Sequence, residues 1–351
     1  MPINSWYCRD IKFSGEEKTV RPKIDDVARA ANVSKATVSR YLNGHFERMS
    51  PATKTRIAAV IEEMDYVPNR QASALKSRRT HLVGVVVADV SNMYSTRLIA
   101  GISELTKEAG DQILIADSAN DPGEELRTLQ LLLGQNVDGI ILQPLSTDPH
   151  TYDFIQAQGV QLVMVDRTTT PVAQVTVTSS DYAASRELAE AIVKARYQDL
   201  IVFANPIAGA SSRRLRYQGF ADVAQEHGLS ITLLETGDDS AKEKDAGMIG
   251  QWLTSHPGHR PAVFTTNGRL LMAALTWMQD QGLRAPRDLG ICGYDDWDWA
   301  RLAGPGVTSV NQHPQRIGQT AARYLYQAIA GQPAPAQRIE IPADVTLRHS
   351  L

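Results

Sequence analysis

Short apolar segments separated by amphipathic stretches fill most of the chain from residue 81 onward, and this pattern constrains the fold most. Seven such segments lie at residues 81–87, 112–117, 138–143, 161–166, 200–205, 262–267 and 289–295. They are rich in Val, Ile and Leu without polar alternation, which is typical of strands buried on both faces of a parallel sheet. Strands that alternate with helices predict a doubly wound α/β architecture. Because about 270 residues is large for one such unit, we expect two lobes, with ligand bound where the lobes meet, beyond the carboxyl ends of the strands.

The charge is unevenly distributed along the chain. Residues 21–80 contain 12 Lys and Arg against 6 Asp and Glu, a net charge of +6. The whole chain carries −3 and the first 20 residues balance at zero, so the remainder carries −9. A small basic segment joined to a large acidic one favours a polyanion such as nucleic acid as the partner of the basic segment. A solvated basic face is the plainer alternative.

Several features exclude other classes of protein. No apolar run approaches the roughly 20 residues of a membrane helix, and the N-terminus has no apolar signal core. The two cysteines, Cys8 and Cys292, are far apart, and neither they nor the histidines have the spacing of metal ligands. The chain also lacks a Walker loop, a GxSxG elbow and an HExxH motif. We therefore expect a cytoplasmic protein that is not an enzyme and has no metal, no cofactor and no membrane association.

Four regions follow from these patterns. Residues 1–20 are polar and aperiodic and are expected to form a disordered extension, whereas residues 21–68 have the pattern of short helices. Residues 69–80 are polar and basic, as in a linker. Residues 81–351 form the α/β part.

Residues 24–44, with the sequence IDDVARAANVSKATVSRYLNG, have the pattern of two short helices joined by a tight turn. Asn32 tolerates the strained conformation of such a turn, and Ser34 is a suitable N-cap for the second helix. Ser50 and Pro51 begin a third helix in the same way. The side chains left on the outer face of the second helix are those of Lys35, Ala36, Ser39 and Arg40. A recognition helix presents its N-terminal residues to base edges in this manner.

The segment VSKATVSRYLN at residues 33–43, followed by YVPN at residues 66–69, resembles the head of the LacI family of bacterial repressors, and the resemblance continues over residues 23–349. It implies an all-α helix-turn-helix head and a two-lobed, periplasmic-binding-protein-like α/β sensor. The implied lobes are residues 81–178 with 311–341, and residues 179–310 with 342–351. The chain departs from the family at Lys23, where Thr is usual, and in its N-terminal extension, so the natural start is expected near Val20.

The resemblance also implies which residues contact DNA. Lys35, Ala36 and Arg40 match positions that contact bases, and arginine and lysine typically pair with guanine. The positions that hold phosphates, and so set register without reading sequence, are matched by Ser34, Thr37, Asn43, Ser50 and Asn69. Residues 70–75 resemble a hinge helix, and Leu75 matches the leucine that is inserted into the minor groove as a wedge. Ordinary packing within the linker is the alternative for Leu75.

A third set of residues matches the positions at which the family builds its effector cleft. These residues are Ser91, Asn92, Tyr94, Ser95, Asp117, Asp166, Arg167, Arg216, Asn267, Asp295, Trp297 and Trp299. Arg216, in the motif RLRYQGF, matches the effector-binding arginine, and the planar fork of its donors suits carboxylates or vicinal hydroxyls. A tryptophan face can stack on a sugar. The alternatives are that Asp295 only caps a turn and that the two tryptophans belong to the core.

The class of effector is indicated by charge. Where the family usually has Asp after the strand-end Asn, this chain has Gly268 followed by Arg269, and Arg167, Arg213 and Arg214 add further cations near Arg216. Segments 92–103, 118–125 and 295–310 resemble members that sense sugar acids of the 2-keto-3-deoxygluconate and 2-ketogluconate type. A sugar acid is therefore expected as the effector. A neutral sugar, a nucleoside or purine, and a protein corepressor remain alternatives.

Together these observations predict a DNA-binding repressor, associated with the bacterial nucleoid, that binds a pseudo-palindromic operator as a homodimer. The chain lacks C-terminal heptads for a tetramer and closes with the strand-like segment IEIPADVTLRHS. Loss of Arg216 is expected to uncouple the effector from DNA without unfolding the protein. The main alternative is a solute-binding protein without DNA function, against which the basic head and the missing signal sequence argue.

Overall fold

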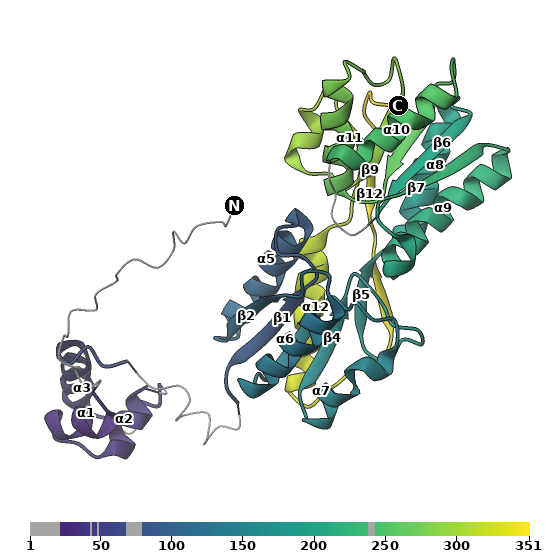
Figure 1. Ribbon diagram of the computed structural model, residues 1–351. Coiled ribbons are helices and arrows are strands. Elements are labelled where there is room, and N and C mark those ends of the chain that lie inside the picture. Colours follow the sequence, from purple (N-terminus) through teal and green to yellow (C-terminus); the bar gives the residue numbers. More distant parts are fainter. Residues whose placement is uncertain (1–21, 43, 48, 68–78, 238–242) are drawn as a thin grey trace, which may run out of the picture. The chain divides into compact units, whose positions relative to one another are not determined.

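The computed structural model describes residues 22–42, 44–47, 49–67, 79–237 and 243–351 (Figure 1). The chain divides into two compact units, Met1–Arg78 and Arg79–Leu351. The expected N-terminal extension and residues 69–78 of the expected linker lie outside the described residues.

The first unit contains three helices around a small core. They are α1 (Ile24–Ala30), α2 (Lys35–Leu42) and α3 (Pro51–Glu63). The backbone at Asn32 turns between the first two helices with a φ of 48°, as its residue type predicted. Val27, Val38 and Ile57 are fully buried where the helices meet.

Local hydrogen bonds fix where these helices begin. The Ser34 hydroxyl accepts from the backbone N–H of Thr37 at 3.2 Å, and the Ser50 hydroxyl accepts from that of Thr53 at 3.3 Å. Both are N-caps of the predicted kind. Lys23 provides no side-chain cap; instead the Asp26 carboxylate accepts from the Lys23 backbone N–H at 2.9 Å. The N-terminus of α1 is thus satisfied from within the helix.

The second unit contains two six-stranded sheets. The first has the order β11-β5-β4-β3-β1-β2, with β1 (Leu82–Val87), β2 (Gln112–Asp117), β3 (Gly139–Leu142), β4 (Gln161–Val165), β5 (Thr176–Ser179) and β11 (Arg338–Ile341). The second has the order β12-β10-β9-β8-β6-β7, with β6 (Asp199–Ala204), β7 (Ser230–Glu235), β8 (Ala262–Thr265), β9 (Gly290–Tyr294), β10 (Thr308–Asn311) and β12 (Asp344–Thr346). All neighbouring strands are parallel except β10 and β12.

Helices cover both faces of each sheet and define two lobes. Lobe 1 is the first sheet with α5 (Met93–Glu108) and α12 (Pro314–Ile329) in one core and α6 (Pro122–Gly134) and α7 (Asp153–Ala157) in the other. Lobe 2 is the second sheet with α8 (Asp181–Lys194) and α9 (Ser211–His227) in one core and α10 (Gly247–Ser255) and α11 (Gly268–Asp280) in the other. Short 3-10 turns lie at Pro149–Tyr152, Ile207–Gly209, Glu243–Ala246 and Asp298–Arg301. The predicted doubly wound architecture is confirmed.

The contact between α5 and α12 joins segments that are far apart in the sequence (Figure 1). A Cβ atom at Gly101 would lie 2.0 Å from the carbonyl oxygen of Gln315, and one at Gly318 would lie 2.2 Å from that of Leu98. Only glycine permits this close approach. The packing matters for the site, because the first residues of α5 enter the space between the lobes.

The chain crosses between the lobes three times: between β5 and α8, between β10 and α12, and between β11 and β12. Such crossings act as hinges when ligand biases the closure of two lobes. Among the described residues, no helix has the length and apolar character needed to cross a membrane.

Candidate functional site

The exposed start of α2 lies on the outside of the first unit. Lys35, Ala36 and Arg40 are exposed, as the sequence predicted, and Ser39 is half-buried. The ammonium group of Lys35 pairs with the Asp25 carboxylate at 3.1 Å, but both side chains are more than half exposed. Such an exposed pair contributes little to stability, so the Lys35 ammonium group remains available to another acceptor.

A hollow beside this helix brings together the N-terminal ends of α2 and α3. Its lining residues are Val33, Ser34, Thr37, Arg40, His45, Met49, Ser50 and Thr53. Two helix N-termini and a guanidinium group that face one hollow form a site suited to an anion such as a phosphate. Of the expected DNA contacts, Ser34, Thr37 and Ser50 lie here together with Arg40. His45 joins them without having been predicted.

Three further expected DNA contacts, Asn43, Asn69 and Leu75, lie outside the described residues. Their roles remain predictions.

A second hollow is a cleft in the Arg79–Leu351 unit. We call it the interlobe cleft, and its lining residues are Ala88, Asp89, Asn92, Tyr94, Ser95, Asn120, Gln143, Asp166, Arg167, Asn205, Ser212, Arg213, Arg216, Thr266, Asn267, Arg269, Asp295 and Gln312. Most of them follow the carboxyl end of a strand or begin the next helix, where ligands bind in doubly wound folds. Both lobes contribute, as the sequence pattern predicted.

Two aspartates occupy equivalent positions in the two lobes. Asp166 follows β4 and Asp295 follows β9, each the third strand in the order of its sheet. Both have left-handed backbone conformations, with φ of 63° and 75°. This conformation is uncommon for residues other than glycine, although aspartate adopts it more readily than most. It directs two carboxylates into one cleft.

Each of these carboxylates is fixed by hydrogen bonds. The Gln143 amide donates to Asp166 at 2.7 Å, and the backbone N–H of Gly268 donates to Asp295 at 2.8 Å. The Gln312 amide also donates to Asp295. The carboxylates therefore have fixed orientations and retain lone pairs that can accept from the hydroxyl groups of a ligand.

Arg216 is the most tightly held cation in the cleft. Its guanidinium group donates to Asp181 at 2.8 Å, to the carbonyl oxygen of Thr266 at 2.6 Å and to the Gln312 amide oxygen at 2.5 Å. It also lies over the ring of Tyr294, 3.9 Å from the centroid. Burial raises the pKa of Asp181 to about 6, although Arg216 opposes this shift. The contacts of Arg216 with Asp181, Thr266 and Gln312 largely compensate its charge within the protein.

Three described residues that line the cleft carry a buried polar atom without a hydrogen-bond partner, although one of these atoms, the Nε of Arg167, lies 3.7 Å from the Asp166 carboxylate. Among the described residues, the hydroxyl groups of Tyr94 and Thr266 and the Nε of Arg167 are buried and lack hydrogen-bond partners. Burial, with the nearby Asp166 carboxylate, holds the pKa of Tyr94 well above its usual value, so its hydroxyl remains a donor. Buried polar groups are normally satisfied by a hydrogen bond, so these three atoms distinguish the cleft from an ordinary protein interior.

Eight of the twelve expected effector residues line the cleft: Asn92, Tyr94, Ser95, Asp166, Arg167, Arg216, Asn267 and Asp295. The other four lie elsewhere. The carboxylate of Asp117 is exposed and accepts from the backbone N–H of Ala119, and the backbone N–H of Ser91 donates to Asp89. Trp297 is buried in the core of lobe 1, and Trp299 packs against that core.

Of the ten other lining residues, Arg213 and Arg269 were expected as cations near Arg216, and eight were not expected: Ala88, Asp89, Asn120, Gln143, Asn205, Ser212, Thr266 and Gln312. Three of these residues come directly after a strand: Gln143 after β3, Asn205 after β6 and Gln312 after β10. The rule that polar residues at strand ends meet at one edge of a sheet could have identified them.

Two ion pairs join the lobes at the cleft and beside it. Arg269, at the start of α11, pairs with Asp89, which follows β1. Arg97 of α5 pairs with Asp298 at 3.7 Å, and its guanidinium group lies 4.7 Å from the ring centroid of Trp297. Only the first pair lines the cleft.

The described end of the expected linker, Arg79 and Thr80, and the next residue, His81, are held by two carboxylates of lobe 1. Asp138 accepts from the backbone N–H groups of Thr80 and His81 at 2.7 and 3.0 Å, and from Arg79 Nε at 3.2 Å. Asp111 accepts from Arg79 at 2.7 Å and contacts the His81 ring at 2.6 Å. We call this arrangement the linker anchor.

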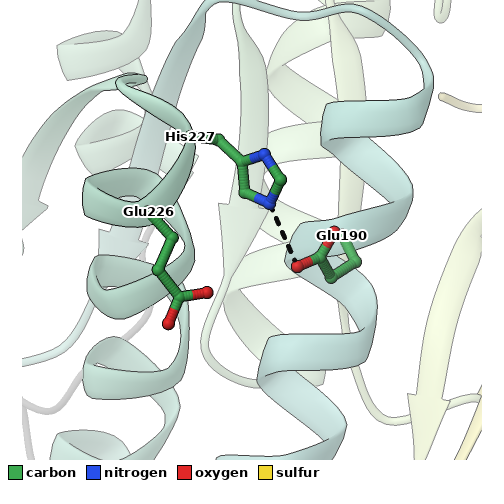
Figure 2. A group of neighbouring side chains, drawn as sticks. All are labelled: Glu190, Glu226 and His227. Atoms are coloured by element: carbon green, nitrogen blue, oxygen red, sulfur yellow. Dashed lines mark hydrogen bonds and ion pairs between the residues drawn. The ribbon is translucent and has the colours of Figure 1, made fainter.

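One group of side chains on lobe 2 has the residue types of a metal site. Glu190 on α8 lies opposite Glu226 and His227 on α9, and His227 contacts Glu190 at 3.2 Å (Figure 2). Arg186, however, donates to both oxygens of Glu226, at 2.9 and 2.6 Å. Because that carboxylate already has a cationic partner, the group is a surface ion-pair network, and we assign no metal to it.

Comparison with known proteins bears on both units. Residues 23–69 match the model of bacterial regulatory proteins of the lacI family, and residues 189–351 match that of the periplasmic binding protein-like domain. The HTH-type transcriptional regulator KdgR of Bacillus subtilis (strain 168) is 32% identical over 339 residues, which are 96% of this chain and 99% of the relative. PtxS of Pseudomonas plecoglossicida is 34% identical over 94% of this chain and 96% of its own.

Solved structures agree on the fold. A lac repressor dimer bound to operator and the anti-inducer ONPF has a TM-score of 0.82 at 23% identity and covers 94% of this chain and 98% of its own. A complex of the transcriptional regulator CelR with cellobiose has a TM-score of 0.68 at 26% identity, over 94% of this chain and 100% of its own.

Proposed function

Because the chain belongs to the lacI family of bacterial regulatory proteins, we propose that it represses transcription from a pseudo-palindromic operator and that a sugar acid bound in the interlobe cleft controls its DNA binding. The family assignment makes the chain a DNA-binding transcriptional regulator with an effector-binding sensor, and not an enzyme. The proposal adds the form of the operator, the sense of regulation, the contact residues and the effector.

In the proposed complex, the start of α2 enters the major groove. Lys35, Ala36 and Arg40 are exposed there and contact bases. The hollow between α2 and α3 holds a phosphate through the capped helix ends at Ser34 and Ser50. Asn43 and Asn69 add phosphate contacts, and Leu75 is the minor-groove wedge.

Substitutions separate these kinds of DNA contact. Lys35→Ala should relax the preference at one or two base pairs, whereas Asn69→Ala should weaken binding to all sequences about equally. Leu75→Ala should reduce both DNA bending and specific affinity. Gel shifts on a set of operator variants measure the first two effects, and a bending assay measures the third. Unchanged bending and affinity in Leu75→Ala would reject the wedge.

The effector proposal depends on one observation: a cleft lined by four arginines and three aspartates includes residues whose buried donors lack hydrogen-bond partners. A sugar acid carries both matching groups. Its carboxylate pairs with arginine, and its hydroxyls donate to Asp166 and Asp295 and accept from Tyr94 and Arg167.

The effector acts through the two lobes that it touches. A ligand shifts the equilibrium between two arrangements of the lobes only by the difference between its affinities for those arrangements. A molecule that contacts both lobes meets that condition, because its contacts change whenever the lobes move.

Thermal-shift screening and calorimetry with sugar acids, the matching neutral sugars and purines test the effector class. The expected result is tighter binding of a sugar acid than of its neutral counterpart. If a neutral sugar or a purine binds more tightly than every acid tried, the acid assignment is wrong.

A neutral sugar is the second candidate, for a specific reason. The cleft contains the carboxylates of Asp89, Asp166 and Asp295, which are good acceptors for hydroxyl groups. A structural relative at 26% identity is described in complex with cellobiose. The same screen decides between the two candidates.

A further inference from the structure

Arg269 and Asp89 form the ion pair that joins the two lobes within the interlobe cleft. Arg269 lies in the first turn of α11 in lobe 2, and Asp89 lies between β1 and α5 in lobe 1. Any ligand that enters the cleft meets a cation and an anion that already bind each other.

The local backbone explains why Arg269 is the side chain that α11 presents here. A Cβ atom at Gly268 would lie 2.8 Å from the Cβ of Asp295 and 3.1 Å from the indole nitrogen of Trp297. No side chain fits at that position without displacing Asp295. The side chain of Asn267 caps the helix by accepting from the backbone N–H of Leu270 at 3.0 Å. Arg269 is therefore the first side chain of the helix that can reach across the cleft.

Asp89 is held in place on the opposite side. One of its carboxylate oxygens accepts from the backbone N–H of Ser91 at 2.8 Å and from the Ser91 hydroxyl at 2.6 Å. Its other oxygen pairs with Arg269. The carboxylate is a fixed partner, whereas the long side chain of Arg269 can move.

Exposure distinguishes Arg269 from the other arginines of the cleft. The residues Arg167, Arg213 and Arg216 are at most 9% exposed, whereas the side chain of Arg269 is 40% exposed and that of Asp89 is 20% exposed. Because the Arg269 side chain is exposed, solvent screens this pair more than a fully buried one, and a carboxylate from solution can reach Arg269 and compete for it. Arg216 offers no comparable exchange, because Asp181, Gln312 and Thr266 bind it inside the protein.

We propose that Arg269 is the residue that selects an anionic effector, and that it does so by exchanging the Asp89 carboxylate for that of the effector. The exchange separates an ion pair that spans the lobes, so the step that recognises the acid also changes a contact between the lobes. This inference rests on the proposed function of the cleft.

The test is calorimetry on the full-length protein, which gives the ratio of the affinity for a sugar acid to the affinity for the matching neutral sugar. The probes are 2-ketogluconate and D-fructose, which differ only in a carboxylate against a hydroxymethyl group, together with gluconate and D-glucose. In Arg269→Gln the preference for the acid over the neutral sugar should fall by about tenfold or more, because a hydrogen bond between charged groups is lost. Arg269→Lys, which keeps the charge, should retain part of the preference.

The partner variant separates exchange from a general effect of charge. Asp89→Asn removes the competing carboxylate and should strengthen binding of the acid. In Asp89→Asn/Arg269→Gln that gain should vanish, because no cation is left to be released. A gain of the same size in the Arg269→Gln background would overturn the exchange, since it would reflect only the charge of Asp89.

Arg97→Gln is the matched control, because it breaks the other interlobe pair, Arg97–Asp298, outside the cleft. It should leave the acid preference unchanged, and an equal loss there would overturn the inference. Thermal unfolding of each variant checks that it is folded. If wild type prefers acids and Arg269→Gln keeps that preference, the exchange fails and the proposed function stands. If wild type prefers no acid, both fail.

Discussion

Arg216 illustrates how burial changes what a residue does. Its motif predicted an anchor for the effector, and the side chain does line the cleft. Its guanidinium group is nevertheless bound by Asp181, on the helix that follows the first crossing, and by Gln312, near the second crossing. Arg216 therefore ties together two of the three segments that connect the lobes, in addition to facing a ligand.

This position alters the expected effect of removing Arg216. Arg216→Ala leaves the Asp181 carboxylate, which is 1% exposed, without its partner. Breaking a buried pair from one side costs roughly 3–5 kcal/mol, so we now expect a clear loss of stability rather than a folded, uncoupled protein. Urea unfolding measures it. Arg216→Ala/Asp181→Asn should recover part of the loss, and a wild-type midpoint for Arg216→Ala would contradict this account.

A second prediction at the residue scale concerns pH. Burial raises the pKa of Asp181 to about 6 and also raises that of Asp295. An anion bound in the cleft disfavours the ionised forms further and so raises both pKa values. Binding of an acid should therefore take up protons near pH 6, and the affinity should increase as the pH falls from 8 to 6.

Calorimetry in buffers of different ionisation enthalpy measures this proton uptake. Asp181→Asn should lose part of the uptake, because one of the two groups no longer titrates. A proton count of zero at pH 6 in wild type, with an acid demonstrably bound, would show that neither carboxyl group senses the ligand.

At the scale of single elements, the sequence predicted the strands that are apolar throughout. β1, β3, β4, β6, β8 and β9 correspond to contiguous apolar runs, and β2 was also predicted. β5 was missed because its residues Thr176, Thr178 and Ser179 are polar, although they are at most 2% exposed. Its burial depends on β11, which comes more than 150 residues later and pairs with it. The pattern of residues within β5 cannot predict such a long-range contact.

The candidate site shows the same limit. Asp166 and Asp295 could be predicted because each follows an apolar run. Trp297 and Trp299 follow the same run as Asp295, yet they pack into the core. Arg269 and Asp89 were not expected to meet, because their contact requires both lobes. Position along the chain predicts which end of a strand a residue occupies, but not which way its side chain points.

The linker anchor is an element whose role can be tested. Asp138→Asn weakens the acceptor for Arg79, Thr80 and His81 and should loosen the end of the expected linker where it joins lobe 1. Effector affinity should stay close to that of wild type, because Asp138 is outside the cleft. The change in DNA affinity on effector binding should shrink, by up to the ~1–3 kcal/mol typical of allosteric coupling.

Parallel gel shifts and calorimetry measure the two quantities for Asp138→Asn. Asp153→Asn is the matched control, because it removes the same charge from an exposed carboxylate that pairs with His150 at 2.9 Å, away from the linker anchor. Full coupling in Asp138→Asn would show that the anchor has no part in transmission.

At the scale of the whole molecule, the small size of the head favours binding of DNA by two copies of the chain. The described part of the head presents one exposed helix, α2, and the hollow proposed to hold a phosphate, so a single copy would make few contacts with DNA. In a homodimer, two heads would bind adjacent half-sites with a high effective concentration, and their two-fold symmetry would match a pseudo-palindrome. We therefore expect light scattering to give twice the mass of the chain.

Salt dependence provides an independent check on the dimer. Each phosphate contact releases a counterion, and the logarithm of the affinity falls with the logarithm of salt in proportion to the number of contacts. A full operator engages two heads and a half-site only one, so the slope for the full site should be about twice that for the half-site. An insertion of about five base pairs between the half-sites turns the second half-site to the opposite face of the duplex, because one helical turn takes roughly 10 base pairs. The affinity should then fall toward that of the half-site. A monomeric mass, together with equal slopes and equal affinities for half and full sites, would show that one head is sufficient and that the operator is not read by a dimer.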